Sequence, residues 1–225
     1  MLGIITAVRE EYEAVYANMK EVTFPSNHLY PVVVGIINNT RVALSYCGIG
    51  KVNAAIATSK LLSLDLDINV ILNIGVVGAT VEGLSTYDIV LVRKAIQTDF
   101  DCSPIGYKKF EVPNTDKTHF LCNIMSLGDC LIGKPDIRSL RQVVCGTSDK
   151  FLSTLKDKQE VASLGVEVCD MEAAAIAQVC DKHSIPMVSI KVVSDDLSDT
   201  SNEEYSFNLI KACDKITAVI SRILE

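Results

Sequence analysis

The chain lacks the charge pattern of a nucleic-acid-binding protein and the long apolar run of a membrane-spanning one. Its 225 residues include 21 Lys and Arg against 28 Asp and Glu, which gives a formal net charge of -7. Basic runs are as short as Lys108 and Lys109, so no basic patch is offered to a phosphate backbone. No apolar run approaches the ~18 residues that a membrane span needs. We therefore expect neither a nucleic-acid partner nor a membrane, whereas a neutral or cationic small ligand is compatible with the charge.

The chain also lacks the spacings of a disulfide framework or a metal site. Its eight cysteines contain no C-x-x-C pair, and its three histidines, His28, His119 and His183, show no ligand spacing. The N-terminal apolar stretch reaches charge at Arg9 without a basic start, which is unlike a secretory signal. We expect no metal, a cytoplasmic location, and reduced cysteines that behave as small buried residues.

What is present is an alternation of apolar runs with helical patterns. The apolar runs fit buried strands at 2–6, 31–37, 41–46, 68–77, 88–93, 141–147 and 186–194. Helical patterns occupy 9–19, 51–63, 119–131, 171–183 and 204–224. No repeat or linker divides the chain, so residues 1–225 are expected to form a single-domain α/β three-layer sandwich, with a mixed, mostly parallel central sheet flanked by helices. The consecutive strands at 31 and 41 predict an antiparallel hairpin through Asn38 and Asn39.

In such a sheet, ligands bind beyond the carboxyl ends of the strands, so the residues that follow each apolar run are the candidates. One helical pattern, DMEAAAIAQVC at 170–180, begins with two carboxylates. Asp170 is explained as a cap of the helix N-terminus. Glu172 is explained less well, because its apolar surroundings suggest burial, where a carboxylate needs a partner.

The other candidates each have a simple structural explanation when taken alone. Glu11 fits the first turn of a surface helix, and GIGK at 48–51 fits a tight turn with only a weak likeness to a phosphate loop. Phe151 fits a core position, and Asp195 fits a turn cap. The irregular segment 101–118 is long enough to be functional or mobile.

Taken together, these stretches resemble the 5'-methylthioadenosine/S-adenosylhomocysteine nucleosidase family, within the purine nucleoside phosphorylase superfamily. The resemblance rests on GIGKVNAA at 48–55, DMEAAAIAQVC at 170–180 and SDDLSD at 194–199, and it extends from Gly3 to the final helix. It implies a nucleoside phosphorylase-like fold, no cofactor, a homodimer, and cleavage by water of the bond between adenine and C1' of a 5'-thioribose.

The resemblance also implies a role for each site residue. Glu11 corresponds to the carboxylate that deprotonates the attacking water, and Asp195 to the group that assists adenine departure through N7. The implied substrate contacts are Phe151 and Leu152 on the base, Met171 and Glu172 on the ribose, Val8, Ile49 and Tyr205 around the 5' group, Val76, Lys191 and Ser194 in the surrounding shell, and Ile105 and Pro113 from a dimer partner.

These residue types suit the chemistry, because cleavage of a glycosidic bond builds positive charge on the sugar that carboxylates stabilise. Adenine is a poor leaving group as an anion, so Asp195 should carry a raised pKa while Glu11 stays ionised as the base. Val76 and Lys191 depart from the small hydroxyl residue and the arginine that the bacterial enzymes commonly carry. Valine cannot donate a hydrogen bond and lysine lacks a planar fork, so a lower rate is expected.

Two other functions remain open from the sequence. A nucleoside phosphorylase would use phosphate instead of water, and it needs a cluster of cations to hold that phosphate. Here only Arg9, Arg41, Lys51 and Lys191 lie near candidate strand ends. A noncatalytic nucleoside-binding protein of the same fold would need neither Glu11 nor Asp195. The preferred 5' substituent, including 5'-deoxyadenosine and aminodeoxyfutalosine as alternatives, stays open.

Overall fold

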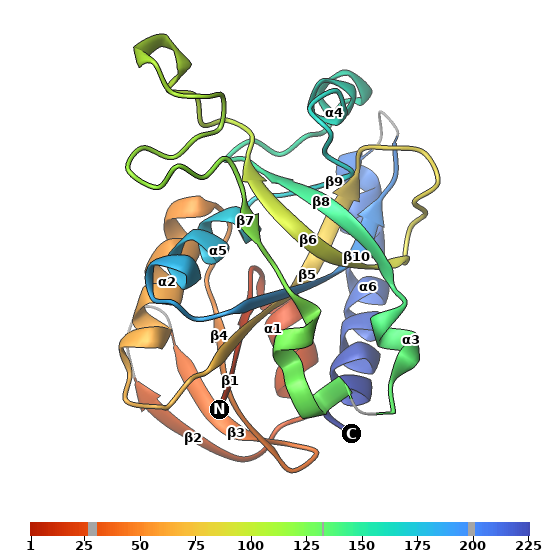
Figure 1. Cartoon of the computed structure of the whole chain (residues 1–225). Helices are drawn as coiled ribbons and strands as arrows, with labels where there is room; N and C mark the ends of the chain where they lie inside the picture. Colours follow the sequence, from red (N-terminus) through yellow and green to blue (C-terminus); the bar gives the residue numbers. More distant parts are fainter. Residues whose placement is uncertain (27–30, 132, 198–200) are drawn as a thin grey trace.

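The structure is a computed structural model that describes residues 1–26, 31–131, 133–197 and 201–225. Its strands form a mixed sheet, as predicted, in which two groups of parallel strands, β4-β1-β5-β10 and β6-β8-β9, run in opposite directions (Figure 1). The strands are β1 (Leu2–Thr6), β2 (Lys20–Ser26), β3 (Val32–Ile37), β4 (Thr40–Tyr46), β5 (Val70–Ala79), β6 (Ile89–Gln97), β7 (Phe120–Leu121), β8 (Arg141–Thr147), β9 (Val168–Asp170) and β10 (Met187–Asp195).

Strand β10 closes part of this sheet into a ring. It pairs in parallel with β5 and antiparallel with β6, while β6, β8, β9 and β5 are joined in that order. Gly78 of β5 therefore lies between Asp195 of β10 and Cys169 of β9. A sequence pattern alone does not show this closure, because it depends on one long strand pairing on both edges.

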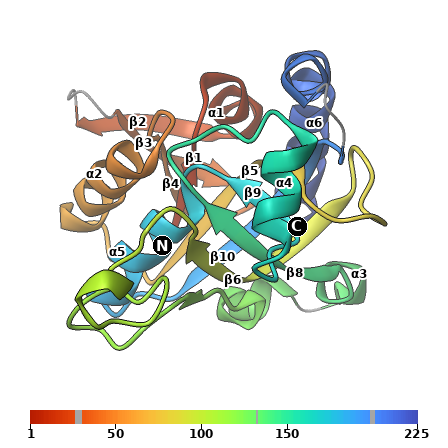
Figure 2. The same ribbon diagram turned by 90° about the horizontal axis from the view of Figure 1, so that it is seen from above.

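Helices cover both faces of the sheet, which confirms the three layers. Alternate residues of β5 face opposite sides, so Leu72 and Ile74 pack with α1 and α6, and Ile71 and Val77 pack with α2 and α5 (Figures 1 and 2). The helices are α1 (Arg9–Tyr16), α2 (Lys51–Ser63), α3 (Pro135–Arg138), α4 (Leu155–Ala162), α5 (Ala173–Lys182) and α6 (Ser201–Leu224), with 3-10 turns η1 (Ser103–Ile105) and η2 (Ile124–Leu131).

One predicted helix is wrong. Residues 119–131 form the short strand β7, which pairs with β6, followed by the 3-10 segment η2, in which Gly128 has non-helical angles. The predicted hairpin is confirmed, since β3 and β4 pair antiparallel and both Asn38 and Asn39 have positive φ. Strands β2 and β9 and helices α3 and α4 were not predicted, because their patterns are short or polar.

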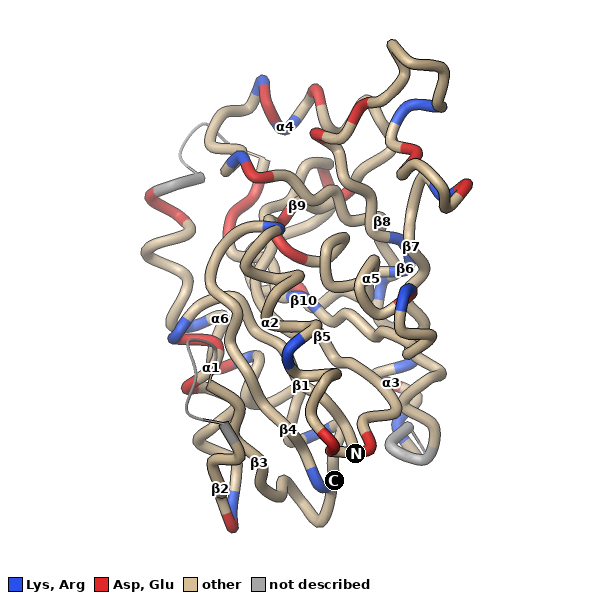
Figure 3. The backbone as a smooth tube through the Cα atoms, turned by 90° about the vertical axis from the view of Figure 1, so that its left-hand side faces the viewer, with Lys and Arg blue, Asp and Glu red and all other residues tan. Residues whose placement is uncertain are grey.

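The irregular segment 101–118 projects from one end of the molecule, beyond β6 and away from the chain termini (Figure 1). Lysines and arginines are scattered along the chain instead of gathering on one element (Figure 3). Across the described ranges, no helix combines the length and apolarity of a membrane span. Five of the seven described cysteines are buried and all seven are free, as expected, and these five are Cys47, Cys122, Cys145, Cys180 and Cys213.

Candidate active site

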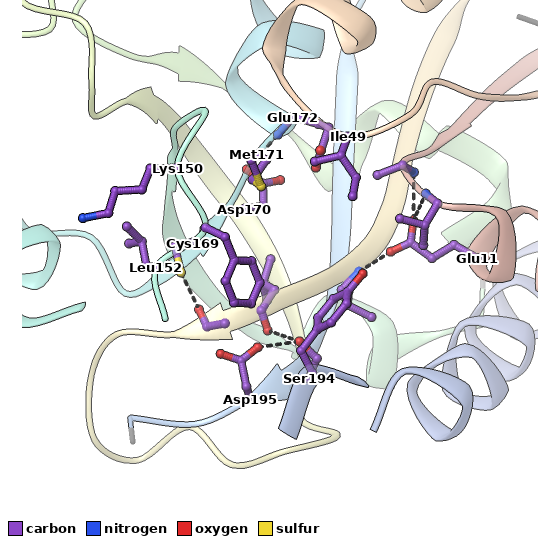
Figure 4. A pocket seen from close by; sticks show the side chains of 17 residues that line it. Glu11, Ile49, Lys150, Leu152, Cys169, Asp170, Met171, Glu172, Ser194 and Asp195 are labelled. Atoms are coloured by element: carbon purple, nitrogen blue, oxygen red, sulfur yellow. Dashed lines mark hydrogen bonds between the residues drawn. The ribbon is translucent and has the colours of Figure 1, made fainter. Parts of the chain in front are cut away.

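A pocket opens where the C-terminal ends of β5 and β10 meet the start of α1 and the loops that lead to α2, α4 and α5 (Figure 4). Eleven of the fourteen predicted site residues line it. Its lining consists of Ala7, Val8, Glu11, Ile49, Val76, Val77, Gly78, Lys150, Phe151, Leu152, Cys169, Asp170, Met171, Glu172, Ser194, Asp195 and Tyr205. The last two residues of the SDDLSD motif lie outside the described residues.

Glu11 is turned inward from the first turn of α1 and is 1% exposed, so the interpretation as a surface helix residue is wrong. One carboxylate oxygen accepts hydrogen bonds from the backbone N–H groups of Ala7 (2.8 Å) and Val8 (3.2 Å), and the other accepts from Val76 (2.8 Å). Burial raises the pKa of Glu11, while the charge of Lys191 and these backbone bonds oppose the rise. Glu11 is thus a fixed carboxyl that takes up a proton more readily than an exposed one.

The position of the Glu11 carboxylate also explains why residue 75 of β5 is a glycine. A Cβ atom on Gly75 would lie 2.7 Å from Oε1 of Glu11, so only glycine leaves room for this carboxylate. The backbone amide of Val76, not its side chain, reaches Glu11. A hydroxyl at position 76 is therefore not needed to hold the carboxylate itself.

Asp195 ends β10 on another wall of the pocket. Its Oδ1 accepts a hydrogen bond from Ser194 Oγ at 2.7 Å, and its Oδ2 lies 2.7 Å from the ammonium of Lys158. The ammonium also donates to the backbone carbonyl of Asp196. The sequence did not indicate that a cation lies beside Asp195.

Lys158, the cation that contacts Asp195, is a charged residue beside the pocket that the sequence did not indicate. It lies on α4, whose remaining residues are polar or only partly buried, so a lysine there suggests an exposed position. The spacing of Thr154 and Asp157 marks the start of α4, and Thr154 does accept from the backbone N–H of Asp157. That signal locates the helix, but it does not show which side chain turns inward.

Glu172 and Asp170 form the third acidic part of the site. Glu172 is buried, as expected, and accepts from the backbone N–H of Gly50 at 2.9 Å. Burial, followed by the charge of Asp170, raises the pKa of Glu172 to about 8. Asp170 accepts from the N–H of Ala173 at the start of α5, which confirms the predicted cap.

Lys191 does not line the pocket, although it was predicted to contact the substrate or the attacking water. Its side chain is buried behind the pocket wall, and its ammonium forms an ion pair with Asp170 at 3.0 Å. Nearby carboxylates, Asp170 above all, outweigh burial and raise the pKa of Lys191. Lys191 therefore supports the site from behind, without lining it.

The aromatic residues lie at the mouth. The rings of Phe151 and Tyr205 meet edge to face with centroids 5.7 Å apart, and Val8 and Ile49 also line the pocket. Ile105 and Pro113, from the projecting segment, do not line the pocket of their own chain, and Ile105 is 74% exposed. Their predicted contribution to a partner's pocket stays a prediction.

The GIGK stretch does not act as a phosphate loop. The N–H of Gly50 binds Glu172, and the N–H of Lys51 donates to Asp149 at 2.8 Å. The ammonium of Lys51 lies 2.6 Å from Asp99. The donors that would hold a phosphate are therefore already occupied by carboxylates of the chain.

Comparison with known proteins agrees with this geometry. The family model described as the phosphorylase superfamily matches residues 1–225. The 5'-methylthioadenosine/S-adenosylhomocysteine nucleosidases of Marinomonas sp. (strain MWYL1) and Haemophilus ducreyi are each 30% identical to the chain, covering all of it and 98% and 97% of their own lengths. The chain belongs to this nucleosidase family.

Solved structures place the fold in the same family. The nucleosidase from Neisseria meningitidis, in complex with methylthio-immucillin-A, is 25% identical with a TM-score of 0.90, over 99% of this chain and 97% of that one. Futalosine hydrolase of Helicobacter pylori, 22% identical with a TM-score of 0.88 over 99% and 96%, shares the fold. As a family member, the chain combines the nucleoside phosphorylase-like fold with a pocket rich in carboxylates.

Proposed function

We propose that this chain hydrolyses the N-glycosidic bond of 5'-methylthioadenosine, S-adenosylhomocysteine or a related 5'-deoxyadenosine, releasing adenine and a 5-substituted ribose. The observation that supports it best is the placement of two carboxyls in different surroundings around one pocket. Glu11 is held by backbone amides alone, whereas Asp195 is held by a hydroxyl and an ammonium. Two carboxyls held independently on different walls of one pocket can act as a base on one side of the substrate and as a leaving-group acid on the other.

In the proposed reaction, Glu11 accepts a proton from water as the water oxygen bonds to C1'. The bond between C1' and N9 breaks, its electron pair goes to adenine, and adenine takes a proton at N7 through Asp195. Positive charge that builds on the ribose ring is stabilised by the nearby Glu11 carboxylate, and Glu172 holds the ribose hydroxyls. Phe151 offers its ring face to the base, and the backbone of Leu152 offers it hydrogen bonds.

The charges around the pocket favour water over phosphate as the nucleophile. Four carboxyls, of Glu11, Asp170, Glu172 and Asp195, line the pocket. The three lysines at or behind the wall each contact an aspartate, and these pairs are Lys150 with Asp157, Lys158 with Asp195 and Lys191 with Asp170. A phosphate dianion would meet repulsion here, and among the described residues that line or back the pocket no uncommitted cation is left to hold it.

The same proposal extends to assembly and location. We propose that residues 1–225 act as one nucleosidase domain in a homodimer, whose partner completes the 5' pocket with Ile105 and Pro113, in the reducing cytoplasm as part of nucleoside catabolism and methionine salvage. Exposed apolar side chains beside the pocket, among them Val52 and Ile56 of α2, support an interface on that side. The free cysteines support a reducing compartment.

The decisive experiment measures adenine release from 5'-methylthioadenosine in phosphate-free buffer, and again with phosphate added. Glu11→Gln and Asp195→Asn are each expected to lower kcat by about 10²- to 10⁴-fold, the usual contribution of acid or base catalysis. Glu10→Gln and Asp196→Asn change the exposed neighbours of these residues and should leave kcat unchanged.

Each outcome has a clear meaning. Release that needs both carboxyls and ignores phosphate supports the nucleosidase. Release that begins only when phosphate is added would show that the chain is a phosphorylase instead. If the chain binds the nucleoside but releases no adenine under either condition, and the related 5'-deoxyadenosines also stay intact, the chain is a noncatalytic binding protein.

A further inference from the structure

A lysine is enclosed next to the proposed leaving-group acid. Lys158 is 0% exposed, although it belongs to α4, a helix rich in charged residues. A buried ammonium loses its hydration and persists only where carboxylates or carbonyls replace the water. Here Oδ2 of Asp195 at 2.7 Å and the carbonyl of Asp196 replace it.

The Asp195 carboxyl is held from three directions. Lys158 contacts Oδ2, and Ser194 donates to Oδ1 while its own hydroxyl lies 3.2 Å from the carbonyl of Val77. On the third side, a Cβ atom at Gly78 would lie 2.7 Å from Oδ2. The carboxyl therefore has little freedom to rotate, and its orientation toward the pocket depends on the partners that hold it.

The ion pair also joins two parts of the site. Phe151 and Leu152, the proposed base contacts, lie on the segment that continues directly into α4, and Lys158 ties that helix to the end of β10. Figure 2 shows α4 lying over this end of the strands. The contact thus sets the position of the base-binding segment relative to the acid.

A purely structural role for Lys158 is the alternative. Cys169 of β9 and the backbone of Asp196 also face this ammonium, so it could simply fasten α4 to the sheet. However, α4 could be fastened more simply by apolar packing, since replacing a buried ion pair by apolar residues is often neutral or stabilising. A buried lysine whose carboxyl partner lines the pocket suggests a use in the reaction.

We propose that Lys158 is a positioning residue for the leaving-group acid. Together with Ser194, it holds Asp195 in the orientation from which the carboxyl shares a proton with N7 of the departing adenine. This inference rests on the proposed nucleosidase function.

The test compares two substrates that differ in their need for N7 protonation. One is 5'-methylthioadenosine, and the other is 4-nitrophenyl 5-methylthioriboside, whose nitrophenolate departs without a proton. Lys158→Met should lower kcat on the adenine substrate by about 10- to 100-fold, as expected for a misplaced catalytic group, and leave kcat on the nitrophenyl substrate within about twofold. Lys158→Arg keeps the charge and should fall between wild type and Lys158→Met. Lys156→Met, an exposed lysine of the same helix, is the matched control.

A double-variant cycle adds a second readout. If Lys158 acts only through Asp195, Lys158→Met combined with Asp195→Asn should be no slower on the adenine substrate than Asp195→Asn alone. The double variant also removes both members of the buried pair, so it should be at least as stable as either single variant. Should Lys158→Met fail to fold, Lys158→Arg must still lose activity selectively on the adenine substrate.

The outcomes separate this inference from the function on which it rests. Equal losses on both substrates, or additive losses in the double variant, overturn the positioning role while wild-type activity stands. Wild-type protein that cleaves neither substrate overturns the proposed function, and the role of Lys158 with it.

Discussion

At the scale of single residues, the buried carboxyl of Glu172 links folding to pH. Its pKa is raised to about 8, above the ordinary value near 4.5 that it regains on unfolding. Between these values the folded chain holds a proton that the unfolded chain has released. The stability from this group is therefore fully present below about pH 4.5 and is lost as the pH rises through 8, by at most ~1.4 kcal/mol per pH unit.

Glu172→Gln removes this dependence, because glutamine stays neutral. Without nucleoside, wild type should lose stability relative to Glu172→Gln as the pH rises from 5 to 8. The free energy of unfolding of Glu172→Gln minus that of wild type should therefore become more positive over this range. Denaturant unfolding at several pH values measures it, with the exposed Glu160→Gln as a control that follows wild type. Parallel curves for Glu172→Gln and wild type would show that burial does not raise this pKa.

At the scale of elements, the hairpin between β3 and β4 depends on two asparagines. Ile37 pairs with Thr40, and Asn38 and Asn39 between them both have positive φ, the two-residue turn that suits twisted strands. Asn39→Ala should lower the free energy of unfolding by about 1 kcal/mol, since alanine lacks the short polar side chain that helps asparagine adopt a positive φ, while Asn39→Gly, which has no Cβ, should cost nothing. Denaturant midpoints measure both, and kcat should be unchanged because the turn is remote from the pocket. Equal midpoints for both variants would contradict the argument.

How far an element could be predicted from the sequence depended on how much of it is apolar. The long strands β5 and β10 are apolar on both faces and were found easily. The stretch 119–131 is also largely apolar, but its structure depends on the pairing of Phe120 with β6 and on the non-helical angles of Gly128. A periodic pattern of apolar residues does not predict either feature. Helix α4 fully buries only Lys158, and its few apolar residues are partly buried, so its inward face carries only a weak apolar signal.

At the scale of the whole molecule, resemblance located the pocket residues while the support behind them had to be seen in three dimensions. Glu11, Glu172 and Asp195 come from distant segments, and motif order was enough to propose them together. The ion pairs of Lys158 and Lys191 join α4 to β10 and β10 to β9, and these contacts follow from the ring closure. No spacing along the chain encodes a contact between residues whose elements meet only after the sheet has closed.

The proposed dimer gives a test that only a shared site can pass. Ile105→Glu should raise KM for 5'-methylthioadenosine by at least about tenfold, because a charge would enter the partner's apolar 5' pocket. Glu11→Gln should be inactive. When both variants are expressed together, each mixed dimer regains one complete site, with Glu11 from one subunit and Ile105 from the other. With random pairing, the mixture should recover about a quarter of wild-type activity.

The matched control for this mixture is Glu11→Gln with Asp195→Asn. Both residues line the pocket of one and the same chain, so every dimer keeps two defective sites and the mixture should stay inactive. Recovery in the first mixture alone shows that Ile105 serves the neighbouring subunit. Two results would instead place the complete site within one chain: full activity of Ile105→Glu, or wild-type protein that is active while light scattering shows it to be a monomer. In either case the pocket would need nothing from the projecting segment of a partner.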